Sequence, residues 1–555
     1  MKVLWLIPIL FLAITINIHN YWLPELNKFD GNINYYRSPD NQPYLHGNDV
    51  WYYYRLMRDA EDGHIGDEYG SDIYRINTNI NSFIFMPSIA AMLNNVLHLP
   101  SMTFAYFFPT MIMVLIIFSF FFLAKKIFDI DVALISTFLL SIHPRFYSAT
   151  KAGFFDTTGI SILFTIVVIY CFIKIQDHVF WTLPMLSMLY LFSIHWIGAI
   201  YLLPIIVLSM IPIVLLNPLI GKKYLPFFLT IGVFSIIKYK LLIGSIKHIL
   251  SYINQSNIFI TVAELQPLPL KDLTQLMQPH FLIAAIIGLY FIYRFRNIKN
   301  VILFPWFILL FFVSFNNART LQFLVLPLCM LAGYAIYLSV KHFSQYEEFI
   351  YILVPLIVIV FILFTLFTFV RVNDNSVCDT CPLMSDALWS SAEFIHTLPG
   401  EKLVITWWDY GYVYQAISEV KTLSDGGSYD IRKDSRVAKA LLSESEDEFI
   451  SYLFPLANFS HRVFFIITED MLNKVQSIQS IADEGVVSPR TYNPIILKST
   501  NNSGRIAYVP PELKDTMFIR LSRGNETFFN ITKVFDTKFD YPLYVGRVIV
   551  YEIVI

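Results

Sequence analysis

The chain has 555 residues, of which 56% are hydrophobic and only 15% are charged. A soluble globular protein carries about 25% charged residues, so this composition excludes a single soluble enzyme, a disordered chain and a disulfide scaffold. The 40 basic and 42 acidic residues give a formal net charge of −2, which excludes an overall basic surface for nucleic acid. The composition predicts a membrane protein.

Apolar runs of about 18 or more residues predict the membrane spans. We expect spans at about 3–19, 102–123, 130–148, 158–175, 179–195, 198–216, 224–243, 281–297, 301–316, 320–340 and 349–370. This makes eleven, and two short spans more between 158 and 260 would keep the same parity. The first run has no clear small-x-small cleavage site before Asn20, which favours an uncleaved signal anchor over a signal peptide.

Basic residues in short loops predict the orientation. With the N-terminus inside, these residues all fall in inside turns, as the positive-inside rule expects. They are Lys2, Lys125, Lys126, Lys174, Lys222, Lys223, Arg294, Arg296, Lys299 and Lys341. The residues after 370 then lie on the external side of the membrane.

The chain is expected to have two domains. Residues 1–370 form a transmembrane domain with long external loops at about 20–101 and 244–280, and residues 371–555 form an external domain. Within the external domain, residues 402–405 and 463–467 have the pattern of short buried strands, each followed by a helical pattern. The predicted fold class is a polytopic α-helical membrane domain followed by a mixed α/β soluble domain.

Four cysteines add one local prediction. Cys171 and Cys329 fall within predicted spans and are expected to be small apolar residues of the packing. Cys378 and Cys381 form a Cys-x-x-Cys motif just outside the last span. A zinc site needs about four ligands, so a local disulfide in an oxidising compartment is the favoured interpretation, with a redox function as the alternative.

Three carboxylates lie on the predicted external side. Asp49 follows Gly-Asn in the first loop, Asp156 follows Gly-Phe-Phe at the external end of the third span, and Glu264 ends Thr-Val-Ala-Glu in the later loop. Converging carboxylates suit Mg²⁺ or Mn²⁺, which take oxygen ligands. The ordinary alternatives are solvated charge for Asp49 and Glu264, and a helix cap through Thr157 and Thr158 for Asp156.

The segment Trp-Trp-Asp-Tyr-Gly at 407–411 directly follows a predicted strand. Open α/β sheets place their ligands at the carboxyl ends of strands. An aspartate beside two indole N–H donors can hold a small hydroxyl while the rings exclude water. The alternative is a core aromatic pair with a helix-capping aspartate.

This segment resembles the hallmark of the catalytic subunits of oligosaccharyltransferases, which N-glycosylate asparagine. Residues 419–427, Glu-Val-Lys-Thr-Leu-Ser-Asp-Gly-Gly, are similar to the bacterial single-subunit form. Asp49, Asp156 and Glu264 resemble, in order, the family's first-loop aspartate, its second acidic motif and its T-x-x-E loop. The resemblance covers nearly the whole chain and implies a membrane domain of the GT-C type.

For the reacting groups, the resemblance implies that Asp49, Asp156 and Glu264 bind Mn²⁺ or Mg²⁺. It also implies that Asp49 and Glu264 accept hydrogen bonds from the acceptor carboxamide. Arg319 matches the family's arginine for the lipid diphosphate, with a snorkelling end-of-span arginine as the alternative. Tyr429 replaces a histidine that assists the diphosphate in better-known bacterial members.

For the acceptor, the resemblance implies that Trp407, Trp408 and Asp409 hold the Ser/Thr hydroxyl two residues after the asparagine. Met471 lies where bacterial members carry an M-x-x-I helix, but Lys474 stands where isoleucine is expected. Three further departures from the family's pattern occur within the predicted transmembrane domain. The usual second acid is Thr158, the usual arginine is Ala149 with Lys151 close by, and the arginine expected twelve residues after Glu264 is Leu276.

The expected protein is therefore a metal-dependent, inverting N-oligosaccharyltransferase. Its donor is a lipid-linked oligosaccharide on a dolichyl or undecaprenyl diphosphate, and its acceptors are polypeptides with Asn-x-Ser/Thr. We expect it to act as a single subunit in a bacterial inner membrane, with its active site on the periplasmic side. The alternatives are another GT-C glycosyltransferase, such as a protein O-mannosyl or lipid-sugar transferase, and a transporter, which would bury charges near the membrane midplane.

Overall fold

The computed structural model describes residues 2–22, 38, 42–64, 85–230, 268–295, 299–315, 318–343, 384–427, 431–455, 462–482, 498–499, 505–506, 513–538 and 547–554. The chain forms two compact units. The first, here called the helical unit, comprises Met1–Leu23, Phe107–Asn254 and Val262–Asp379. The second, called the mixed unit, comprises Pro24–Tyr106, Gln255–Thr261 and Thr380–Ile555. The mixed unit thus combines the first predicted loop with the C-terminal part of the chain.

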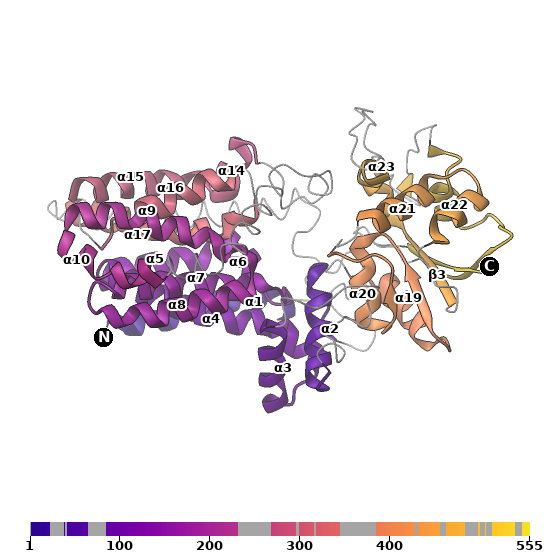
Figure 1. Cartoon of the computed structure of the whole chain (residues 1–555), viewed down its shortest axis with the longest axis horizontal. Coiled ribbons are helices and arrows are strands. Elements are labelled where there is room, and N and C mark those ends of the chain that lie inside the picture. Colours follow the sequence, from indigo (N-terminus) through magenta and orange to yellow (C-terminus); the bar gives the residue numbers. More distant parts are fainter. Residues whose placement is uncertain are drawn as a thin grey trace. The chain divides into compact units, whose positions relative to one another are not determined.

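The long helices of the helical unit run roughly parallel to one another (Figure 1). Its described helices are η1 (Lys2–Trp5), α1 (Leu6–Trp22), α4 (Ser101–Ile127), α5 (Ile130–Ile142), α6 (Pro144–Thr150), α7 (Thr157–Lys174), η2 (Val179–Trp181), α8 (Thr182–His195), η3 (Ile197–Tyr201), α9 (Leu202–Leu216), α10 (Pro218–Lys222), α14 (Leu270–Met277), α15 (Pro279–Phe295), α16 (Leu303–Ser314), η5 (Ala318–Thr320) and α17 (Leu321–Phe343). Helix α4 begins within the mixed unit and continues into the helical unit.

Three of the described helices are long and apolar enough to cross a membrane: α4, α7, and α17 together with the turn before it. Helices α14 and α15 meet at an angle of 87° and add a fourth span if they form one broken helix. The predicted span at 349–370 and most of that at 224–243 lie outside the described residues. The chain is a multi-pass membrane protein, and the number of eleven spans stays a prediction.

Basic residues gather at one end of the helical unit. Lys2 pairs with Asp131 at 2.8 Å, which places the start of the chain beside the start of α5. Lys126 at the end of α4 pairs at 2.5 Å with Asp177, which follows α7. The lysines that the sequence assigns to one side of the membrane therefore share one end of this unit.

Two predicted site residues lie at the other end. Asp156 is the residue before α7, and Arg319 lies in the short turn before α17. The C-terminal part of α17 lies at the lysine end, because Tyr334 stacks on Phe128 with ring centres 4.6 Å apart. Asp156 and Arg319 are therefore both at the end opposite Lys126.

The mixed unit is built on a five-stranded sheet in the order β2-β1-β3-β7-β6. Its strands are β1 (Lys402–Ile405), β2 (Lys421–Thr422), β3 (Arg462–Thr468), β6 (Ile531–Lys538) and β7 (Arg547–Ile553). Strand β1 runs parallel to β2 and β3, whereas β7 runs antiparallel to β3 and β6. The apolar run in β3 is buried along its length, as expected for a strand covered on both faces. The α/β fold predicted for this part of the chain is confirmed.

Helices surround this sheet (Figure 1). They are α19 (Asp386–Thr397), η6 (Trp408–Tyr410), α20 (Gly411–Ile417), α21 (Ile431–Leu442), α22 (Glu446–Leu453), η7 (Glu469–Lys474), α23 (Val475–Ala482) and α24 (Met517–Arg523), with a separate pair of short strands, β4 (Lys498–Ser499) and β5 (Arg505–Ile506). Ser385 and Ser445 cap α19 and α22 through their hydroxyl oxygens. Aromatic contacts fix two of the helices, because Phe449 of α22 packs on Phe465 of β3 and Phe394 of α19 stacks on Phe535 of β6.

Two helices of the first predicted loop complete the mixed unit. Helix α2 (Asp49–Glu61) buries its first two turns, including Trp51, which packs 6.4 Å from Trp389 of α19. Helix α3 (Phe85–Leu97) packs on α2. Loop residues are thereby brought into one compact body with the C-terminal sheet.

Candidate functional site

The candidate site lies at the carboxyl ends of β1 and β3. Trp407 and Trp408 follow β1 after Thr406, and η7 directly follows β3. Because β1 and β3 are parallel neighbours, the segments that leave them meet at the same edge of the sheet. There Lys474 Nζ lies 2.6 Å from Asp409 Oδ2.

A chain of hydrogen bonds fixes this edge. Lys474 also donates to the hydroxyl oxygen of Tyr410 at 2.9 Å, and Tyr410 in turn donates to Asp470. Thr468 donates to the other oxygen of Asp470 at 2.7 Å. These four residues, spread over both segments, orient the Asp409 carboxylate through its contact with Lys474.

Both pKa shifts at this edge favour the ion pair. Burial alone would lower the pKa of Lys474, but the oxygens of Tyr410, Asp470 and Asp409 facing its ammonium group raise that pKa well above its usual value. Burial also raises the pKa of Tyr410 well above its usual value, so its hydroxyl stays protonated and able to donate. At neutral pH, Lys474 is charged and Asp409 faces a cation.

The two tryptophans directly precede Asp409 in the chain. The Trp407 side chain is buried, and its ring lies edge-on to that of Trp408 with centroids 6.4 Å apart. In the part of the chain that the structure describes, the buried indole N–H of Trp408 has no hydrogen-bond partner. Leaving a buried donor unpaired costs about 1–3 kcal/mol, so a ligand oxygen that accepts from this N–H would be stabilised.

Met471 and Lys474 differ in how they relate to this site. Met471 is fully buried, and its sulfur accepts the backbone N–H of Thr468 at 3.5 Å. Its role in acceptor binding stays a prediction. The sequence shows Lys474 only as a departure from M-x-x-I and does not predict its contact with Asp409. The four-residue spacing from Asp470 to Lys474 just after a predicted strand is the signal that could have found it.

Asp49 belongs to the same unit as the Trp-Trp-Asp segment. It is the first residue of α2, and it lies against the segment that follows β2. A Cβ atom at position 426 would lie 3.2 Å from Asp49 Oδ1 and 2.6 Å from the Tyr412 ring. Tyr412 itself stacks on Tyr52, one turn further along α2, with ring centroids 5.0 Å apart.

Asp156, in the helical unit, is the N-cap of α7. Its Oδ1 accepts from the Thr158 backbone N–H at 2.9 Å and from the Thr158 hydroxyl at 2.6 Å. The capping interpretation is therefore confirmed. Among the described residues, no hydrogen bond reaches Oδ2 of Asp156, so that oxygen can bind a cation while Oδ1 caps the helix.

The predicted metal site is only partly described. Glu264 and Tyr429 lie outside the described residues, as do Cys378 and Cys381. Within either unit, no three described His, Cys, Asp or Glu side chains gather to form a metal site. The donor types fit a hard divalent cation, since Asp49 and Asp156 offer carboxylate oxygens. The shared ligand set with Glu264 stays a prediction.

The remaining predicted residues of the helical unit lie near α6 and α17. Arg319 is half-buried in η5, directly before α17. Lys151 is buried at the end of α6, where its carbonyl accepts the N–H of Phe154 in the loop that leads to Asp156. A buried cation thus lies five residues before Asp156, in the segment where the family's arginine is replaced by Ala149.

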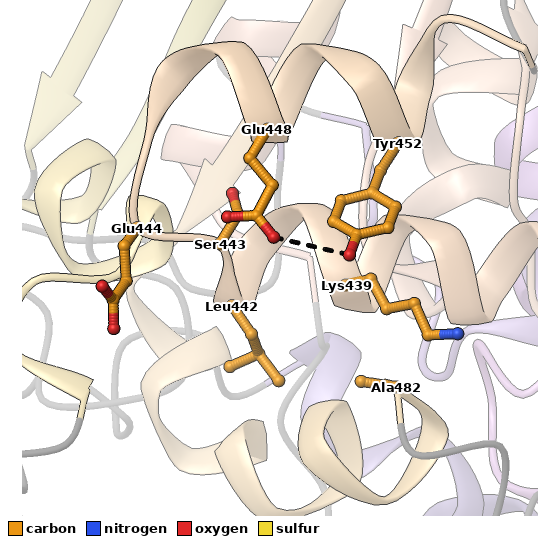
Figure 2. A pocket seen from close by; sticks show the side chains of 7 residues that line it. All are labelled: Lys439, Leu442, Ser443, Glu444, Glu448, Tyr452 and Ala482. Carbon is orange, nitrogen blue, oxygen red and sulfur yellow. Dashed lines mark hydrogen bonds between the residues drawn. The ribbon is translucent and has the colours of Figure 1, made fainter.

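A shallow pocket of about 350 Å³ lies elsewhere in the mixed unit, among α21, α22 and α23. Figure 2 shows Glu448 and Tyr452 of α22 facing Lys439 of α21 across it. The Tyr452 hydroxyl donates to Glu448 at 3.4 Å. None of the predicted site residues lines this pocket.

Two family models match this chain. The family model described as "Oligosaccharyl transferase STT3, N-terminal" matches residues 11–298, just over half of the chain. The chain belongs to the STT3 family. The STT3/PglB/AglB core-domain model matches residues 400–453, which contain β1, the Trp-Trp-Asp segment and β2.

The curated relatives match a short stretch only. The undecaprenyl-diphosphooligosaccharide–protein glycotransferase of Campylobacter jejuni strain RM1221 is 35% identical over 72 residues. A second strain of this bacterium gives the same identity over the same length. The match spans 13% of this chain and about a tenth of the relative's length.

Solved structures match over nearly the whole chain. The Archaeoglobus fulgidus oligosaccharyltransferase tethered to an acceptor peptide with the NVT sequon is 15% identical, with a TM-score of 0.72, covering 97% of this chain and 80% of that one. The same archaeal enzyme with an inhibitory peptide and dolichol-phosphate gives 14% identity and a TM-score of 0.74, with the same coverage. A complex of the same archaeal enzyme with zinc and sulfate is 14% identical, with a TM-score of 0.71. The match covers 96% of this chain and 79% of that one. The predicted fold class, a GT-C membrane domain followed by an α/β domain, is confirmed.

Proposed function

We propose that this STT3-family protein transfers an oligosaccharide from a lipid diphosphate to the side-chain amide of asparagine in Asn-x-Ser/Thr segments. The observation that carries the proposal is at the edge of the sheet: Lys474 holds Asp409, and the preceding residue in the chain, Trp408, has a buried indole N–H without a hydrogen-bond partner among the described residues. Asp49 belongs to the same compact unit. The mixed unit therefore contains both the proposed hydroxyl-binding residues at 407–409 and the proposed reactive carboxylate of Asp49.

The pocket suits a hydroxyl because a hydroxyl both donates and accepts hydrogen bonds. The hydroxyl can donate a hydrogen bond to the Asp409 carboxylate, and its oxygen can accept one from the Trp408 indole N–H. The Lys474 ammonium group lies 2.6 Å from Oδ2 of Asp409, and a carboxylate has two oxygens that accept hydrogen bonds. A peptide with alanine two residues after the asparagine offers no oxygen to the Trp408 N–H and should bind poorly.

The carboxylates act on the acceptor amide. An amide nitrogen is a weak nucleophile because its lone pair is delocalised onto the carbonyl. Asp49 and Glu264 accept its two N–H bonds, which weakens that delocalisation and directs the nitrogen at the first sugar carbon. The new carbon–nitrogen bond forms as the bond to the diphosphate oxygen breaks, with inversion, and one amide proton passes to the carboxylate that holds it, which leaves the nitrogen neutral.

The leaving group is a lipid diphosphate, and cationic residues stabilise its charge. We assign this role to Arg319, with Tyr429 contributing a hydrogen bond. Asp49, Asp156 and Glu264 would hold Mn²⁺ or Mg²⁺, which when bound neutralises charge on the diphosphate. The remaining contribution of the protein is to position the reactants and stabilise the developing charge.

We further propose a bacterial inner-membrane location and a single subunit, with the mixed unit on the periplasmic side. The shared end of Lys2 and Lys126 supports this orientation, because basic residues concentrate on the inside. The partial match to the Campylobacter enzymes, whose name specifies an undecaprenyl carrier, supports the bacterial type. Nucleic acid is not a partner, because the chain carries no net positive charge.

The test incubates the purified full-length protein with lipid-linked oligosaccharide and a peptide containing Asn-x-Thr. With Mn²⁺ present, mass spectrometry should find the glycan on the asparagine, and EDTA should abolish the product. A matched peptide with Ala in place of Thr should gain little glycan. Sugar on a Ser or Thr hydroxyl, or on a lipid, would show that the protein belongs to the other class of glycosyltransferase.

A further inference from the structure

Gly426 lies where three parts of the mixed unit meet. A Cβ atom there would lie 2.6 Å from the Tyr412 ring and 3.2 Å from the Asp49 carboxylate. Atoms at 2.6 Å overlap, so even a methyl group at this position must displace a neighbour. The glycine therefore permits Tyr412, at the start of α20, to reach the N-terminus of α2.

The segment that carries Gly426 is fixed on its far side. Asp425 accepts from the side-chain N–H of Gln415 at 3.0 Å and from the backbone N–H of Gly427 at 2.9 Å. A Cβ atom on Gly411 would lie 2.2 Å from the Ser424 carbonyl, so α20 and this segment are in direct backbone contact. A group added at Gly426 must move Tyr412 or Asp49, because the segment itself has little room to retreat.

Helix α2 follows α20 along its length. Tyr52 stacks on Tyr412 at the first turns of both helices. Near their last turns, Arg58 donates to the Ala416 carbonyl at 3.3 Å and to Glu419 at 2.8 Å. Helix α2, which begins with Asp49, and helix α20, which begins two residues after Asp409, are therefore joined by a ring contact at their first turns and by hydrogen bonds near their last turns.

From these contacts, and resting on the proposed function, we infer that Tyr412 and Gly426 are positioning residues that hold Asp49 at a fixed distance from the acceptor pocket at 407–409. An acceptor bound by its hydroxyl at Asp409 presents its asparagine a fixed two residues away. The amide then reaches Asp49 correctly only if that spacing is kept. Displacing Asp49 leaves the hydroxyl pocket intact, and a displacement of about 1 Å can lower the rate about a hundredfold.

The test separates turnover from binding. In Gly426→Ala, kcat for an Asn-x-Thr peptide should fall at least about tenfold, while the dissociation constant of the peptide stays within about twofold of wild type. Peptide binding also reports that the mixed unit has folded. Tyr412→Phe, which keeps the ring, should turn over at least about tenfold faster than Tyr412→Ala.

A double-mutant cycle tests the contact itself. In the Tyr412→Ala background, adding Gly426→Ala should lower kcat by less than about twofold, because the ring that the methyl group meets is gone. Independent, multiplying effects would overturn the inference, as would a Gly426→Ala protein with wild-type kcat or one that loses peptide affinity in parallel with turnover. An inactive wild-type protein would instead overturn the proposed function, and the inference with it.

Discussion

At the residue scale, the decisive contact is the one between Asp409 and Lys474. Asp409 stands in the turn after β1, and Lys474 ends the turn after β3. The sequence predicted the strand before Asp409 and its place at the carboxyl end of that strand. It did not predict the partner, because the two residues meet only through the pairing of β1 with β3.

Replacing Lys474 by methionine should destabilise the mixed unit by about 1–3 kcal/mol, because Asp409 loses its charged donor. The pKa of Lys474 is raised by folding, so its stabilisation is present at neutral pH and is lost only as pH rises through that raised pKa. The difference in Tm between wild type and Lys474→Met should therefore be constant from about pH 6 to pH 9. Lys421→Met removes the same charge from an exposed position and is the control. Equal melting of the two variants would contradict the assigned contact.

At Asp156, the structure separates the helix cap from the predicted metal ligand. Asparagine caps helices as well as aspartate does, so Asp156→Asn should keep α7 folded while removing the charge. We expect the Mn²⁺ concentration for half-maximal transfer to rise at least about tenfold in Asp156→Asn, about 1.4 kcal/mol. Asp156→Ala should in addition lower the melting temperature. If Asp156→Asn needs the same Mn²⁺ concentration as wild type, Asp156 caps α7 but does not bind the metal.

At the element scale, local pattern and long-range packing contribute differently. The buried run at 463–467 predicts β3, and the run at 402–405 predicts β1, because each is a short apolar segment with turn signals around it. The packing of α2 on α20 could not be predicted, because neither helix carries a local signal for the other. The proximity of Gly426 to Asp49 could not be predicted either, because the two residues are far apart in the sequence.

The hairpin of α2 and α3 has its own anchor. Glu61, the last residue of α2, accepts from Asn94 of α3 at 2.7 Å and from Ser101, the first residue of α4, at 2.6 Å. Glu61→Ala removes both bonds and should increase amide hydrogen exchange in α2 and α3 by about fivefold or more, about 1 kcal/mol of local opening. Asp62→Ala, at an exposed neighbouring position, is the control. Equal exchange in both variants would show that Glu61 does not hold the hairpin.

At the scale of the whole molecule, the predicted domain boundary and the compact units divide the chain differently. The sequence places residues 20–101 with the membrane domain, because they lie between two predicted spans. In the structure, Pro24–Tyr106 belong to the mixed unit with Thr380–Ile555. Hydropathy locates membrane segments but carries no information on which folded body a loop joins.

The residues after Glu264 predict whether the protein requires an acidic residue two positions before the acceptor asparagine. Leu276, half-buried in α14, occupies the position at which better-known bacterial members have the arginine that demands an acid two residues before the asparagine. Leucine cannot pair with a carboxylate, so Asp and Ala at that position should give initial rates within about threefold of each other. Lys271, exposed at the start of α14, is the cation that could replace the arginine. A preference for Asp above about tenfold, or 1.4 kcal/mol, would show that this loop reads the position.

The central claim is that carboxylates from two external loops act on the acceptor amide. Its most direct test is the rate of glycan transfer to an Asn-x-Thr peptide by the double variant Asp49→Ala with Glu264→Gln. The control is Asp62→Ala with Glu401→Gln, a matched change at exposed positions. We predict that the first variant loses transfer by about a hundredfold or more while still binding the peptide, and that the control keeps its activity. Near-normal transfer by the first variant would contradict the account.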